Sequence, residues 1–151
     1  MDQCVLVLGG AGLVGSQIVR EAARELEPER IIVASLFRGE VREFLHDIRR
    51  EFPHIEFIGV WGDVFVRDEF KMERRRRIVQ SQVHREMLYQ DLFGNLNEAY
   101  ERSALVQIVK RYKPNVVVDC INTATAISYQ DVESLSKTTH DILQQLQQIV
   151  D

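Results

Sequence analysis

The sequence has few of the features that mark secreted, membrane or metal-binding proteins. Its 151 residues include only two cysteines, and no apolar run approaches the ~20 residues of a membrane span. Because no signal-peptide pattern opens the chain, we expect a cytoplasmic protein with no membrane partner. Cys4 and Cys120 should lie at opposite ends of a parallel sheet, as buried thiols and not as a disulfide. The four histidines are scattered without an H-E-x-x-H pattern, and we predict no metal site.

An excess of positive charge is also missing. Lys and Arg total 19 against 23 Asp and Glu, and the net charge of -4 argues against nucleic-acid binding. The basic run at residues 71–77 lacks interleaved aromatic residues, so we interpret it as a solvated helix face. A hydrophobic fraction of 45% over 151 residues is that of one ordinary globular domain.

The most informative pattern lies near the N-terminus. The apolar run at residues 4–8 is too short for a helix and suits a strand that is buried on both faces. Glycines follow it, and apolar residues then recur at every fourth position, as on the buried face of a helix. These residues are Gly9, Gly10, Gly12 and Gly15, followed by Val14, Ile18, Ala22 and Leu26.

A strand, a glycine turn and a helix together form a binding site for a pyrophosphate. Gly9 allows a sharp turn, Gly12 allows a ligand to approach the backbone, and Gly15 allows the helix to pack closely. The helix start, at Leu13 and Val14, offers free N–H groups and a partial positive charge to an anion. The alternative is a tight turn without a ligand.

The rest of the chain alternates predicted strands and helices, which indicates an α/β fold with a parallel sheet. We expect further strands at residues 30–34, 55–60 and 115–122, and helices at about 40–51 and from about 131. The segment from about 67 to 113 predicts two or three helices where one would suffice. Val79, Val83 and Met87 should form a buried stripe there, and Asn95 should cap a helix that continues through Tyr112. The predicted architecture is a Rossmann-type three-layer α/β/α sandwich with strand order 3-2-1-4.

The spacing of Gly9, Gly12 and Gly15 resembles that of the short-chain dehydrogenase/reductase superfamily, in particular its extended, NAD-dependent epimerase/dehydratase-like branch. The resemblance implies that Asp63 accepts a hydrogen bond from the adenine amino group and that the N–H of Val64 bonds the ring. It also implies that the loop after the fourth strand lies against the ribose and nicotinamide. The residues of that loop are Asn122, Thr123 and Ala124. An ordinary turn aspartate and an ordinary loop of small residues remain the alternatives.

Two departures from that family matter. The second strand ends without the usual acidic residue and offers Ser35 and Arg38, which suit a 2′-phosphate and favour NADP over NAD. No tyrosine has a lysine four residues later, so the catalytic pair of the family is missing. With four predicted strands, the chain resembles the N-terminal part of a longer enzyme, ending before a fifth strand.

The sequence therefore predicts an NAD(P)-binding domain of an oxidoreductase or epimerase acting on a small carbonyl or sugar substrate. One alternative is a sensor module that binds NAD(P) without turnover. A methyltransferase-like domain that binds adenosylmethionine is another, although it would need the missing acid at the second strand. The sequence leaves homo-oligomer formation open.

Overall fold

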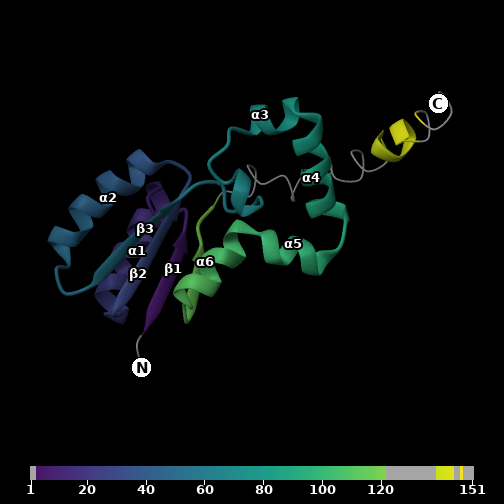
Figure 1. Ribbon diagram of the computed structural model, residues 1–151. Helices are drawn as coiled ribbons and strands as arrows, with labels where there is room; N and C mark the ends of the chain where they lie inside the picture. The colour runs from purple at the N-terminus through teal and green to yellow at the C-terminus, as the bar shows by residue number, and fades with distance from the viewer. Residues whose placement is uncertain (1–2, 122–138, 145–146, 148–151) are drawn as a thin grey trace. The chain divides into compact units, whose positions relative to one another are not determined.

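The computed structural model describes residues 3–121, 139–144 and 147 of the chain (Figure 1). The chain divides into two compact units, residues 1–121 and 122–151. In the second unit, residues 139–144 and 147 are helical, in agreement with the helix predicted there.

The first unit alternates strands and helices around one parallel sheet. Its strands are β1 (Cys4–Leu8), β2 (Arg30–Ser35), β3 (Glu56–Trp61) and β4 (Val116–Asp119). Its helices are α1 (Leu13–Leu26), α2 (Arg38–Glu51), α3 (Arg75–Gln80), α4 (Gln82–Phe93), α5 (Leu96–Arg102) and α6 (Ala104–Tyr112), with a short 3-10 helix η1 (Asp68–Phe70). The strands pair in the order β3-β2-β1-β4, and every pairing is parallel, which confirms the predicted fold.

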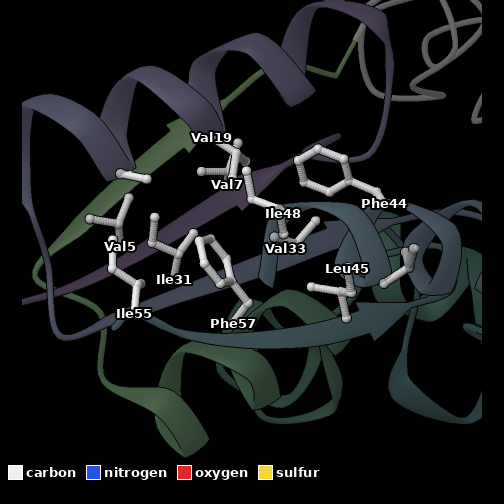
Figure 2. Packing of buried hydrophobic residues seen from close by; sticks show 12 residues of the cluster. Val5, Val7, Val19, Ile31, Val33, Phe44, Leu45, Ile48, Ile55 and Phe57 are labelled. Carbon is white, nitrogen blue, oxygen red and sulfur yellow. The ribbon is translucent and has the colours of Figure 1, made fainter. Parts of the chain in front are cut away.

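The sheet separates two hydrophobic clusters, as a three-layer sandwich requires. One face packs against α1 and α2 through side chains such as Val7, Val33 and Ile48 (Figure 2). The other face packs against α6, where Ile108 contacts a cluster that includes Leu6 and Ile32. Both clusters use alternate residues of the same strands, which is why β1 and β2 are apolar almost throughout.

The buried face of helix α1 is centred one residue beyond the predicted positions, of which Ile18 and Ala22 are partly buried against the same core. Its buried residues are Gly15, Val19 and Ala23, whereas Val14 is 64% exposed and Leu26 is 45% exposed. The reason is steric: a Cβ at Gly15 would overlap the carbonyl oxygen of Gly9 and lie 2.7 Å from the Gly9 carbonyl carbon. Gly15 must therefore face the turn, and this contact sets the rotation of the helix about its axis.

The segment between β3 and β4 also differs from the prediction. Val79 and Val83 are at least half exposed, and α4 contains no buried residue, so the predicted stripe is wrong. Asn95 does cap a helix, accepting hydrogen bonds from the N–H groups of Asn97 and Glu98, but that helix ends at Arg102. Ser103 then has an extended backbone, forms an antiparallel bridge with Arg67, and caps a separate helix, α6.

A charged network holds α4 in place, together with Met87 and Leu88, which pack partly buried against a small apolar cluster. The guanidinium of Arg67 donates two hydrogen bonds to the carboxylate of Asp91, at 2.6 and 2.8 Å, and a third to the carbonyl of Met87 at 2.9 Å. Arg102 donates to the same carboxylate at 3.1 Å. The Arg67 side chain is only 6% exposed, so these bonds satisfy a charge that is otherwise buried.

Candidate functional site

The carboxyl ends of the four parallel strands meet at one edge of the sheet. The strand register aligns Leu8 of β1 with Ala34 of β2 and with Asp119 of β4, and it aligns Ser35 with Trp61 of β3. The turn after β1, the β2–α2 connection and the segment after β3 therefore all leave the sheet at this edge. Ligands of open α/β sheets bind at such an edge.

The turn between β1 and α1 is held by its own backbone. Gly9 has a φ of 73°, a left-handed conformation that favours glycine. The N–H of Gly10 donates to the carbonyl of Ala34, and the N–H of Gly12 donates to the carbonyl of Gly9, both at 3.0 Å. The N–H of Ala11 donates to the hydroxyl oxygen of Ser35, also at 3.0 Å. These hydrogen bonds fix the conformation of the turn without a ligand.

The start of α1 offers backbone N–H groups to an anion. Gly12 is the N-cap and has no side chain that could accept from the first turn. The N–H groups at Leu13, Val14 and Gly15 belong to that turn, where an α-helix provides no internal acceptors. Leu13 is 89% exposed, so the helix start is open to solvent. This arrangement suits a phosphate or pyrophosphate.

At the end of β2, Ser35 and Arg38 have different surroundings, although the sequence predicted that both would contact a 2′-phosphate. Ser35 is 9% exposed, and its hydroxyl oxygen accepts from Ala11, so it supports the glycine turn directly. Arg38 begins α2 and is exposed, with its guanidinium carbon 5.1 Å from the centre of the Trp61 ring. Sequence reasoning missed Trp61, the only tryptophan, although its place at the end of a strand was a usable signal.

Asp63 follows β3 and is almost buried, with 8% of its surface exposed. One carboxylate oxygen, Oδ1, accepts from the N–H of Phe65 at 3.0 Å. The other, Oδ2, accepts from Nε and Nη2 of Arg75, at 3.2 and 3.1 Å. Val64 is also buried and belongs to the cluster beneath α6. Arg75 comes from the basic run, which gave no indication that one of its arginines pairs with Asp63.

The end of β4 lies directly behind the glycine turn. The N–H of Cys120 donates to the carbonyl of Leu8 at 2.9 Å, and a Cβ at Gly9 would lie 3.1 Å from the carbonyl oxygen of Cys120. Burial raises the pKa of the Cys120 thiol, and the negative charge of Asp119 raises it further. Both cysteines are free; Cys4 is buried, as predicted, whereas Cys120 is only partly buried. The three loop residues that should contact ribose and nicotinamide lie outside the described residues: Asn122, Thr123 and Ala124.

A cavity of about 530 Å³, whose lining contains no residue of the glycine turn, lies between β3, η1 and α6. Its lining includes Val60 and Tyr112 but also charged side chains that are paired, Lys71 with Asp68 and Arg102 with Glu98. No group of His, Cys, Asp and Glu in the described part of the chain could hold a metal ion. Among the same residues, no helix is long and apolar enough to cross a membrane.

Comparison with known proteins gives a structural likeness only. No family model matches the sequence, and no curated protein matches it. The X-ray structure of Pen from Bacillus thuringiensis superposes with a TM-score of 0.42 and 18% sequence identity. The superposition covers 78% of this chain and 38% of that chain, so this sequence corresponds to much less than the whole of Pen. At this level of similarity the match carries no information about function.

Proposed function

We propose that the chain binds NAD(P) at the carboxyl edge of its sheet, as the dinucleotide-binding part of an oxidoreductase or epimerase of the short-chain dehydrogenase/reductase type. The observation that carries this proposal is the uncapped start of α1 behind the glycine turn. Gly12 offers no capping side chain, and the helix start from Gly12 to Val14 is exposed at the edge of the sheet. A pyrophosphate matches the charge and the hydrogen-bonding capacity of that position.

The remaining parts of the dinucleotide would lie along the same edge. Asp63 offers a carboxylate to the adenine amino group, and Arg38 offers a guanidinium to the 2′-phosphate of NADP. The loop with Asn122, Thr123 and Ala124 would contact the ribose and nicotinamide, as the family resemblance implies. NAD(P) supplies hydride-transfer chemistry when it is bound, to a substrate that we propose to be a small carbonyl compound or sugar.

For these 151 residues we propose binding without turnover. The tyrosine and lysine pair that the family uses for proton transfer is missing from the sequence. The same observation favours a second candidate, a sensor that binds NAD(P) and never catalyses. A tyrosine and lysine pair in a longer form of the protein would favour the enzyme over the sensor.

The test is isothermal titration with NADPH and NADH, applied to the wild type and to Gly12→Val. Gly12 has a φ of -74°, which any residue adopts, and a Cβ there would lie 3.2 Å from the Gly9 carbonyl oxygen. The φ is compatible with valine, but the contact with Gly9 is tight, so circular dichroism and urea unfolding must first establish that the variant is folded. In a folded variant the side chain would occupy the space of the pyrophosphate. We expect binding by the wild type and none by a folded variant. Unchanged affinity in a folded Gly12→Val would show that the phosphates bind elsewhere.

A further inference from the structure

Arg75 ties the helical segment after β3 to the candidate nucleotide site. It is the first residue of α3, and two of its nitrogens contact one carboxylate oxygen of Asp63, Oδ2, at 3.1 and 3.2 Å. The Asp63 side chain is 9% exposed, whereas that of Arg75 is 48% exposed. Because water screens a half-exposed pair, its contribution to stability is small. Its larger effect is on the orientation of the Asp63 carboxylate.

The contacts of Asp63 fix both of its carboxylate oxygens. Oδ1 accepts from the N–H of Phe65, and Oδ2 accepts from Arg75. An ionised carboxylate has about four lone-pair positions, so three N–H contacts leave capacity for one more donor. These contacts fix the direction in which the free lone pair of the carboxylate can accept a hydrogen bond. Asp63 is thus held as an oriented acceptor at the end of β3.

We propose that Arg75 is a positioning residue for purine recognition. By orienting Asp63 as a carboxylate acceptor, it makes the site select a purine with an exocyclic amino donor, adenine, over hypoxanthine, which presents an oxygen there. This inference rests on the proposed dinucleotide binding and adds a residue from the helical segment to that site. It also gives the segment between β3 and β4 a role in ligand selection.

The experiment compares dissociation constants for NADP and for nicotinamide hypoxanthine dinucleotide phosphate, in which an oxygen replaces the amino group and the adjacent ring nitrogen N1 carries a proton. We expect the wild type to prefer NADP by roughly tenfold to a hundredfold, the range that a hydrogen bond to a charged group provides. Arg75→Ala and Asp63→Asn should bring the ratio close to one, and Arg75→Lys should restore part of it. Arg77→Ala is the matched control, an exposed arginine of the same helix, and should keep the wild-type ratio.

The outcomes separate this inference from the proposed function. If the folded wild type binds neither dinucleotide, both fail together. If it binds both with equal affinity, or if Arg75→Ala keeps the preference for NADP, only the role of Arg75 is overturned. A uniform loss of affinity for both dinucleotides in Arg75→Ala would indicate a purely structural role and would also overturn it. Urea unfolding of each variant establishes that the compared proteins are folded.

Discussion

The variant Gly15→Ala tests whether α1 must pack directly on the turn after β1. The ideal Cβ of Gly15→Ala would overlap the carbonyl oxygen of Gly9 and lie 2.8 Å from the Cα of Gly10. Those atoms belong to the backbone, so no change of rotamer relieves the contact. The turn has little room on the side of β4, because even a Cβ at Gly9 would lie 3.1 Å from the carbonyl oxygen of Cys120. The helix or the end of the sheet must therefore move.

Two opposing effects set the size of the change. Alanine is favoured over glycine inside a helix by about 0.5–1 kcal/mol. Overpacking a close-packed position costs about 1–3 kcal/mol, and more where backbone must move. Because the overlap at Gly15 is with backbone on two residues, the cost exceeds the gain, and we expect a net loss of about 0.5–2 kcal/mol in the free energy of unfolding.

Urea unfolding followed by circular dichroism measures this difference, and Gly39→Ala is the control. Gly39 lies in the first turn of α2, and an added Cβ there would meet nothing within 4 Å. That variant should gain up to ~1 kcal/mol, since only helix propensity changes. If Gly15→Ala were as stable as the wild type, the close contact between α1 and the turn would be refuted.

Three further outcomes follow from named contacts. Arg67→Ala leaves the carboxylate of Asp91 without its bidentate partner, so urea unfolding should show that the free energy of unfolding falls by about 3–5 kcal/mol. A fall of less than ~1 kcal/mol would contradict a buried network. Burial and the charge of Asp119 raise the pKa of the Cys120 thiol, so iodoacetamide at pH 8 should modify Cys120 more slowly than free cysteine, at a rate that rises with pH. Asp119→Asn should speed the reaction, and a wild-type rate equal to that of free cysteine would refute the raised pKa. Arg38→Ala should reduce the preference for NADP over NAD by about tenfold to a hundredfold in paired titrations, and an unchanged ratio would remove Arg38 from the site.

The sheet could be predicted from the sequence because its strands carry the signal themselves. A strand buried on both faces must be apolar throughout, and β1 and β2 meet that condition. The glycine turn likewise follows from local chemistry, since the φ of 73° at Gly9 needs no distant partner to explain it. The boundaries were less certain: β4 ends at Asp119, three residues before the predicted end, and α2 begins at Arg38 instead of about residue 40.

The helical segment could not be predicted because long-range contacts determine it. Val79 and Val83 have the spacing of a buried stripe, yet both are exposed. Charge pairing between Arg67 and Asp91, 24 residues apart, holds α4 together with a small apolar cluster. The basic run is equally ambiguous, since nothing in its composition shows that Arg75 in particular pairs with Asp63. Periodicity in a sequence indicates which residues could share one face of a helix. It does not indicate which other part of the chain packs against that face.

The proposed dinucleotide site is tested most directly by locating the ligand on the protein. In a ¹H–¹⁵N spectrum, the backbone N–H groups at Leu13, Val14 and Gly15 should shift on titration with NADPH, because they are the groups that would contact its pyrophosphate. We predict saturating shifts at these three amides and at Asp63 in the wild type. Saturating shifts confined to residues around the separate cavity near Tyr112, or no shifts at all, would contradict the account.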